Sequence, residues 1–282
     1  MNNISRTVRS ASQTKPLGLM DLPSNWQCHK QLFKIVWGVE TCPDCGGKLL
    51  FRSSYEWCKQ CRTKTSVKSE TNFRYSNLSY RQIYALIWCW QNKQSIGSIR
   101  QIVRLSYPTV HKWLDKLRSL LPEDKSKLSG LVEIDESFFG KMKFTKSGGF
   151  KLVVGAIERD SRKVKLEIVT NREQSTLEDF VLNTVEGGSQ VNTDCWYGYN
   201  DLSWIGYTHE QYNHSKGHFS GTNHIESLWS VIKRHIRSVY GKLSQVDLKL
   251  ILREWEARQN RPELMYNVSN YLNAVVCSGL LQ

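Results

Sequence analysis

The sequence has no long hydrophobic run. Its longest uninterrupted apolar stretch is the eight residues Ile83–Trp90, whereas a membrane-spanning helix needs about 20. The first residues, MNNISRTVRSASQTK, contain no apolar segment of the kind that directs secretion. We therefore expect an intracellular protein, which would be cytoplasmic and nucleoid-associated in a bacterium or nuclear in a eukaryote.

Acidic residues are scarce only in the first part of the chain. Residues 1–130 carry 21 Lys and Arg against 8 Asp and Glu, and residues 131–282 carry 18 of each. The whole formal charge of +13 thus lies in the first part. A basic module joined to a neutral one is typical of a nucleic-acid-binding head on a body with another task. A basic surface without any partner would give the same charge balance.

Four of the eight cysteines form two C-x2-C pairs, and the others are scattered. Two such pairs at this separation can bring four thiolates to one tetrahedral zinc ion. The segment between the pairs has the composition of a short β-hairpin and is too small to bury a core, so the metal would supply its folding free energy. Two redox pairs are the alternative, but no thioredoxin-like pattern surrounds them. The predicted zinc ligands are Cys42, Cys45, Cys58 and Cys61.

A helical pattern follows the cysteine pairs. Three stretches with apolar residues at three- and four-residue spacing are each preceded by a serine, at Ser79, Ser95 and Ser106. Pro108 stands in the first turn of the third stretch. The short connection between the second and third stretches predicts a helix-turn-helix, whose third helix would face a DNA groove. Residues expected to contact DNA from the ribbon and this helix are Arg52, Lys59, Arg62, Lys64, Lys68, Thr109, His111, Lys112, Lys116 and Arg118.

The period changes to two after residue 130. Strands are expected over 131–139, 152–158, 164–170, 190–193 and 207–212. A helix is expected to follow the third strand, with Ser175 as its cap and Glu178 completing a capping box. Two further helices are expected over 222–240 and 245–259. This order is that of a ribonuclease-H-like mixed α/β fold. We therefore predict an α+β multidomain protein with these boundaries: an N-terminal extension (1–40), a zinc ribbon (41–70), a helix-turn-helix domain (71–125), a catalytic domain (130–262) and a C-terminal tail (263–282).

Two aspartates stand near predicted strand ends, and one glutamate lies on a polar stripe of the long helix. Asp135 is expected near the end of the first strand and Asp194 at the end of the fourth, so the two can meet in a mixed sheet. Glu226 shares its stripe with Lys233, apart from the apolar residues that would pack on the sheet. Either Glu133 or Glu136 could replace Asp135 as a ligand. Further candidates for contact with DNA in this cleft are His214, Asn223 and Arg237.

These motifs resemble the zinc-ribbon-headed DDE transposases of bacterial insertion sequences, the ISXO2-like and Merlin-related group. The resemblance extends from about residue 20 to 262. The matching stretches are CPDCG, WCKQC, VEIDESFFG, VNTDCWYGY, the Asn-His-Ser at 213–215, TNHIESLWSVIKR and REWEARQN. The lysine-rich loop after Gly140 matches the family's basic loop only loosely.

The resemblance implies a catalytic triad of Asp135, Asp194 and Glu226, accompanied by Lys233. The three carboxylates would hold two Mg²⁺ or Mn²⁺ ions, which suit hard oxygen ligands. The implied reaction is cleavage at the terminal inverted repeats of an insertion sequence, followed by strand transfer to target DNA within a homodimer or a larger assembly. A domesticated DNA-binding regulator and a nuclease acting on branched or hybrid nucleic acid are the alternatives.

Overall fold

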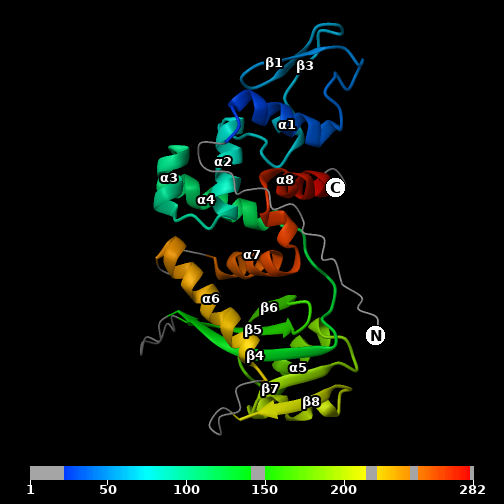
Figure 1. The fold of residues 1–282 in the computed structure, drawn as a ribbon, viewed down its shortest axis with the longest axis vertical. Coiled ribbons are helices and arrows are strands. Elements are labelled where there is room, and N and C mark those ends of the chain that lie inside the picture. The colour runs from blue at the N-terminus through cyan, green and yellow to red at the C-terminus, as the bar shows by residue number, and fades with distance from the viewer. Residues whose placement is uncertain (1–21, 141–149, 214–220, 242–246, 280–282) are drawn as a thin grey trace, which may run out of the picture.

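The computed structural model describes residues 22–140, 150–213, 221–241 and 247–279. A small ribbon lies at one end, a group of helices follows in the middle, and a five-stranded sheet lies at the other end (Figure 1). Within these residues, no helix is long and apolar enough to cross a membrane.

The ribbon is a three-stranded antiparallel sheet in the order β1-β2-β3. A preceding helix, α1, packs on it through the buried side chains of Leu32 and Phe33. Buried His29 of α1 pairs with Glu56 of the middle strand and stacks on Tyr80 of the next helix, with ring centroids 3.9 Å apart. The elements are α1 (Asn25–Trp37), β1 (Leu49–Phe51), β2 (Glu56–Cys58), β3 (Lys64–Thr65) and the 3-10 helix η2 (Val67–Glu70).

The three helices predicted after the ribbon are present, and their start signals are confirmed. Ser79 forms a capping box with Gln82, and Ser95 and Ser106 each accept a hydrogen bond from a backbone N–H of the first turn. These side chains replace the partners that a helix start lacks. The helices are α2 (Tyr80–Gln91), α3 (Ile96–Val103) and α4 (Tyr107–Ser119).

The five-stranded sheet has the order β6-β5-β4-β7-β8, with β4, β5 and β6 antiparallel and with β7 and β8 parallel to β4. This topology bears out the predicted ribonuclease-H-like fold. Its strands are β4 (Leu131–Gly140), β5 (Phe150–Glu158), β6 (Val164–Val169), β7 (Gln190–Asp194) and β8 (Thr208–Tyr212).

Helices cover both faces of this sheet. On one face, α5 (Gln174–Thr184) and the 3-10 helix η3 (Tyr197–Ser203) enclose a separate small core. On the other, α6 (Asn223–Tyr240) lies along β4 and β5, while α7 (Leu248–Asn260) borders β6. The apolar stripe expected on the long helix is buried as predicted: Ile225, Leu228, Trp229, Ile232, Ile236 and Val239.

The start of α5 differs from the prediction. Glu173, not Ser175, occupies the N-cap position, and no side chain there makes a capping hydrogen bond. Ser175 lies inside the first turn instead, because the helix begins at Gln174. The capping-box pattern read from Ser175 and Glu178 was therefore wrong.

The chain beyond residue 262 is not a loose tail. It forms the 3-10 helix η6 (Pro262–Met265) and the helix α8 (Val268–Gly279), which returns to the middle helices and lies beside α1 (Figure 1). The Tyr271 hydroxyl donates to the carbonyl of Leu117 at 2.7 Å, and the Gln91 amide donates to the carbonyl of Leu264 at 2.7 Å. The half of the molecule that holds the ribbon and the middle helices therefore contains residues from both ends of the described chain.

Candidate active site

Asp135 lies in the middle of β4, not near its end as expected. Its side chain points to the sheet face that α6 covers, where Trp229 Nε1 donates a hydrogen bond to Asp135 Oδ2 at 3.1 Å. Opposite Asp135 on β5 is Gly155, where an added Cβ would lie 2.5 Å from the Trp229 ring. The missing side chain at Gly155 thus leaves room for the indole that holds Asp135.

Asp194 closes β7 and shares this face of the sheet. Leu131–Glu133 pair in parallel with Gln190–Asn192. Two residues further along each strand are Asp135 and Asp194, so the register sets them side by side across neighbouring strands. The prediction that the fourth strand brings Asp194 to the first is consistent with this register.

The two carboxylates interact electrostatically. Burial raises the pKa of Asp135 to about 7, with further contributions from the negative charges of Glu136 and Asp194. Repulsion of this kind is relieved when a cation binds between the carboxylates. The pair therefore has the chemistry of a divalent metal site.

Glu226 lies in the first turn of α6, the helix whose Trp229 holds Asp135. Its carboxylate accepts a hydrogen bond from the Thr222 hydroxyl at 3.2 Å and is half-buried. In the described part of the chain, no three carboxylates lie with oxygens all within 4.8 Å of one another. Two ions shared among three acids would not need such a compact group, because each ion would bind only some of the acids.

Lys233 lies two turns further along α6. Its Nζ is 5.3 Å from the centroid of the Phe139 ring, at the far end of β4. Burial lowers the pKa of Lys233, and the negative charge of Asp135 opposes this shift. The ammonium group is therefore within electrostatic reach of Asp135.

The two glutamates considered as alternative ligands are engaged elsewhere. Glu133 accepts hydrogen bonds from the Arg159 guanidinium and from the start of α6. Glu136 projects to the opposite face of the sheet and pairs with Arg172 at 3.0 Å. Its alternation with Asp135 along the strand predicts the opposite face, but nothing in the sequence identified Arg159 or Arg172 as their partners.

The four predicted zinc ligands converge. Their sulfur atoms all lie within 4.8 Å of one another, and two of the pairs, Cys42–Cys61 and Cys45–Cys58, are 3.7 and 3.5 Å apart. A tetrahedral ion with Zn–S bonds of about 2.3 Å requires sulfur separations of about 3.8 Å. Hydrogen bonds from the side chain and backbone of Thr63 lower the pKa of the Cys61 thiol to about 6. These thiols fit a structural zinc ion.

The basic residues predicted for DNA contact divide into exposed and buried groups. Lys68 is not available, because its Nζ donates to the carbonyls of Ser76 and Leu78 at 3.0 and 2.8 Å. Lys64 lies over the ring of Tyr55 at 4.3 Å and remains exposed. Exposed candidates on the ribbon are Arg52, Lys59, Arg62 and Lys64.

On α4 the prediction was wrong for Arg118. Its side chain is fully buried and donates to Glu254 of α7 at 2.7 Å and to Asp115 at 2.9 Å. Lys112 is exposed, and Lys116 is half-buried against the ring of Trp113. The other two candidates on this helix, Thr109 and His111, are also half-buried.

Two of the remaining candidates lie on α6. Asn223 and Arg237 are both exposed on α6. His214 lies outside the described residues.

A buried ion cluster joins the middle helices to the sheet domain, and sequence reasoning missed it. Glu254 accepts from Arg118 at 2.7 Å and from Arg258 at 2.8 Å, and the positive charges of these two arginines hold its pKa far below the usual range despite burial. Arg258 also donates to the carbonyls of Trp90 and Gln91 at the end of α2. The cluster therefore ties α2 and α4 to α7.

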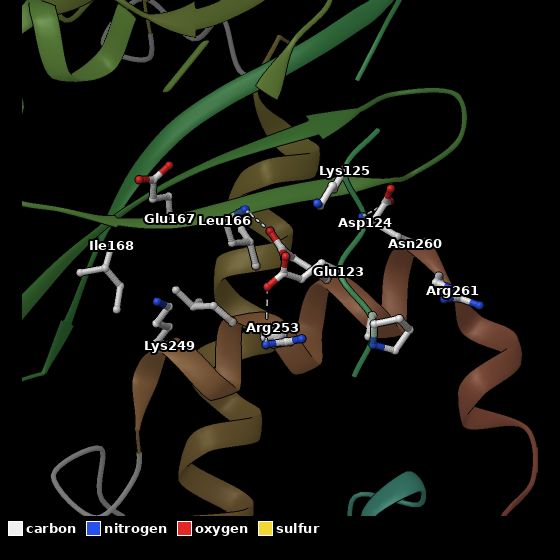
Figure 2. Close-up of a pocket in the computed structure, with 14 residues that line it drawn as sticks. Glu123, Asp124, Lys125, Leu166, Glu167, Ile168, Lys249, Arg253, Asn260 and Arg261 are labelled. Carbon is white, nitrogen blue, oxygen red and sulfur yellow. Dashed lines mark hydrogen bonds and ion pairs between the residues drawn. The ribbon is translucent and has the colours of Figure 1, made fainter. Parts of the chain in front are cut away.

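A cavity of about 420 Å³ lies between residues 122–125, β6 and α7, and none of the three predicted catalytic acids lines it (Figure 2). Glu256 accepts a hydrogen bond from the backbone N–H of Leu166 at 2.7 Å, and Asn260 bonds both the N–H and the carbonyl of Val164. Burial raises the pKa of Glu256 to about 7. These α7 side chains cover the free edge of β6. Two residues of the REWEARQN stretch, Glu256 and Asn260, therefore have a structural role.

Part of this chain is similar to known proteins. The family model of the ISXO2-like transposase domain matches residues 127–260. No curated protein matches the chain.

Several solved structures are similar at low identity. The HTLV-2 integrase catalytic core domain in complex with magnesium is 10% identical with a TM-score of 0.34, covering 48% of this chain and 87% of that one. The BIV integrase catalytic core domain is 15% identical with a TM-score of 0.34, covering 47% and 84%. The simian T-cell lymphotropic virus intasome in complex with the PP2A regulatory subunit B56 gamma is 13% identical with a TM-score of 0.36, covering 63% and 68%.

The matched segment includes β4, β7 and α6 with all three predicted acids. Through residues 127–260, the chain thus carries a DDE transposase domain of the ISXO2-like group.

Proposed function

We propose that this chain is a transposase that binds the terminal inverted repeats of an insertion sequence, cleaves DNA at the element ends and joins them to target DNA. The observation that carries the proposal is the placement of Asp135 and Asp194 side by side on β4 and β7, within the matched domain and beneath the helix that bears Glu226.

Asp135, Asp194 and Glu226 would hold two divalent ions, Mg²⁺ or Mn²⁺. Such ions activate a water or a 3′-hydroxyl and stabilise the charge that develops on the attacking and leaving oxygens. The protein's own contribution is to hold three hard ligands on one face and to orient Asp135 through Trp229. Asp135 must be ionised to act as a ligand, so protons compete with the cations below about pH 7.

Lys233 would bind a phosphate of the DNA end. Its position on α6, beyond Trp229 and near Phe139, places a positive charge beside the acids without a direct ion pair to them in the described structure. Asn223 and Arg237 are exposed on the same helix and would contact the backbone of the same strand.

The ribbon and the middle helices would recognise the inverted repeats. The ribbon presents Arg52, Lys59, Arg62 and Lys64 to solvent, and Lys112 is exposed on α4. Phosphate contacts of this kind supply affinity and register, whereas sequence is read from base edges. A zinc ion held by the four cysteines would keep the ribbon folded.

The assembly would contain at least two copies, because two element ends must be joined in one reaction. A chain that works on chromosomal DNA would reside at the nucleoid of a bacterium or in a nucleus.

The test is cleavage of labelled duplexes that carry the DNA flanking the gene, with Mg²⁺ or Mn²⁺ and the full chain. We expect metal-dependent nicks at the element ends, lost in Asp135→Asn and kept in Asp179→Asn. Asp179 is a matched control because it is exposed on α5, across the sheet from the acids.

The outcomes separate the alternatives. Equal nicking by wild type and Asp135→Asn would remove these acids from the reaction. Metal-dependent cleavage that ignores the end sequence would indicate a nuclease, and tight sequence-specific binding without any cleavage would indicate a regulator.

A further inference from the structure

The strand that bears Asp135 carries two more acids, and the proposed reaction uses neither. Glu133 and Glu136 have side chains that are 0% and 1% exposed. Burying a carboxylate costs free energy unless charged or N–H donors surround it. The two side chains leave β4 on opposite faces, so each meets a different part of the fold.

Glu133, on the neighbouring strand β4, caps the start of α6. The residue at the N-cap position, Thr222, makes no capping hydrogen bond with its own side chain. Glu133 Oε2 instead accepts from the backbone N–H groups of His224 and Ile225 at 2.8 and 3.2 Å. Its Oε1 lies 2.6 Å from His224 Nδ1 and accepts two hydrogen bonds from Arg159, at 3.0 and 2.7 Å.

These contacts leave Glu133 little capacity to bind an ion. A carboxylate has about four lone-pair sites, and five nitrogen atoms lie within hydrogen-bonding distance of this one. Metal coordination would have to displace the donors that start the helix. Glu133 is therefore committed to fixing the first turn of α6 to β4, and Glu226 lies in that turn.

A second contact fixes the same helix one turn later. Trp229 donates to Asp135, two residues beyond Glu133 on β4. With two attachments to one strand, α6 can neither slide along β4 nor rotate about its own axis without breaking one of them. The distance between Glu226 and Asp135 is then set by β4 itself.

Glu136 acts on the other face through a chain of three contacts. Its Oε1 accepts from Arg172 Nε at 3.0 Å, and the Arg172 guanidinium lies 4.0 Å from the centroid of the Trp196 ring. Trp196 is held further by a hydrogen bond from its indole to the carbonyl of Arg172 at 3.1 Å. The backbone N–H of Trp196 donates to Asp194 Oδ1 at 3.0 Å.

We propose that Glu133 and Glu136 are positioning residues, Glu133 for Glu226 and Glu136 for Asp194. One strand thereby sets the spacing of all three acids. The inference rests on the proposed function, since it concerns the same metal site. Glu133 and Glu136 would thus orient the metal ligands and would not bind the metal themselves, the alternative that the sequence left open.

The experiment measures Mn²⁺ binding to the full chain without DNA, by calorimetry and by the electron paramagnetic resonance of free Mn²⁺. For Glu133→Gln we expect Mn²⁺ to bind about 10–100-fold more weakly, the usual cost of losing a residue that orients a metal ligand. Glu136→Gln acts through Arg172 and Trp196, so we expect a smaller loss, about 3–10-fold. Glu167→Gln is the matched control, because Glu167 is exposed on β6 of the same sheet.

Binding is compared at a temperature where circular dichroism shows each variant fully folded. A residue that only stabilises the fold would leave the Mn²⁺ affinity of folded molecules unchanged. Should Glu133→Gln fail to fold, Arg159→Lys supplies the test, since it keeps a positive charge beside Glu133 but loses the two-pronged contact.

Asp135→Asn distinguishes the two proposals. If Asp135→Asn abolishes Mn²⁺ binding while both glutamate variants and Arg159→Lys bind as wild type does, the positioning role is overturned and the metal site stands. If Asp135→Asn binds Mn²⁺ normally, the metal site itself is misplaced.

Discussion

The two groups of candidate metal ligands in this molecule differ in how closely the fold brings their ligand atoms together. The four cysteine sulfurs of the ribbon lie within 4.8 Å of one another and match a tetrahedral ion. The acids of the sheet domain form no such compact group among the described residues, although Asp135 and Asp194 are neighbours.

The difference fits the two tasks that we propose for these groups. A structural site needs all its ligands to close around one ion, whereas a catalytic site needs open positions for substrate. A protonated thiol carries no charge, so the four thiols can lie together without an ion. Ionised carboxylates repel one another. The raised pKa of Asp135 reflects its burial first and the neighbouring negative charges of Glu136 and Asp194 second.

Loss of the ribbon metal should have the largest effect. Cys58→Ser removes a fully buried ligand, and structural zinc contributes about 10 kcal/mol or more to the folding of small zinc modules. We expect loss of bound zinc, rapid proteolysis within residues 41–70 and loss of DNA binding. Zinc content and limited proteolysis measure this, with Cys195→Ser, an exposed thiol outside the cluster, as the control. A protease-resistant ribbon without zinc would break the comparison.

Loss of one acid should abolish catalysis while sparing the fold. Asp135→Asn keeps the size of the side chain and an acceptor for Trp229 but removes the charge. We expect end nicking to fall at least about 10³-fold, about 4 kcal/mol in the barrier, with normal zinc content. Single-turnover cleavage measures it. A fall in zinc content would show that the two sites are not independent.

The pH dependence of stability should reveal the cost of ionising the buried Asp135, to which the neighbouring acids add. An aspartate ionises near pH 4 in the unfolded chain, but the fold keeps Asp135 protonated up to about pH 7. The folded state thus binds the extra proton, so its contribution to the unfolding free energy decreases as pH rises from 4 to 7, by roughly 2–4 kcal/mol.

Urea unfolding without divalent cations, at pH 5 and pH 8, measures this decrease. Glu256 titrates in the same range, so the difference between wild type and Asp135→Asn isolates Asp135. Mn²⁺ at pH 8 should restore much of the loss in the wild type only. An identical pH slope in both proteins would contradict the prediction.

The smallest expected effect comes from Gly155→Ala. The new methyl group would lie 2.5 Å from the Trp229 ring and 2.9 Å from the Leu166 side chain. We expect a loss of about 1–3 kcal/mol in unfolding free energy and weaker Mn²⁺ binding, because Trp229 must move away from Asp135. Gly187→Ala, where nothing lies within 4 Å, should change neither by a measurable amount.

Much of the fold follows from local sequence signals. Serine caps marked the starts of α2, α3 and α4, and the change of period at residue 130 marked the sheet. The spacing of the cysteines predicted a cluster that the structure brings together. These signals depend on residues a few positions apart, which a sequence displays directly.

The failures concern partners that are distant in sequence. Thr222 occupies the N-cap position of α6, but the first-turn N–H groups of His224 and Ile225 donate to Glu133, about 90 residues earlier. Arg118 looked like a solvent-facing base on a helix, but Glu254 of α7 buries it. The candidate acids themselves stay a prediction, since their roles depend on ions and DNA.

The position of α8 has a consequence for how the molecule is made. Chains emerge from the ribosome from their N-terminus, and domains tend to fold as they appear. Here the Asn72 side chain donates to the carbonyl of Val275, and Trp90 packs edge-on against Tyr271. The half of the protein that would grip DNA thus lacks part of its interior until residues 268–279 have been synthesised. A chain that ended before residue 268 would keep most of the sheet domain but would bind DNA more weakly. Incompletely synthesised chains would therefore be less able to act on a genome.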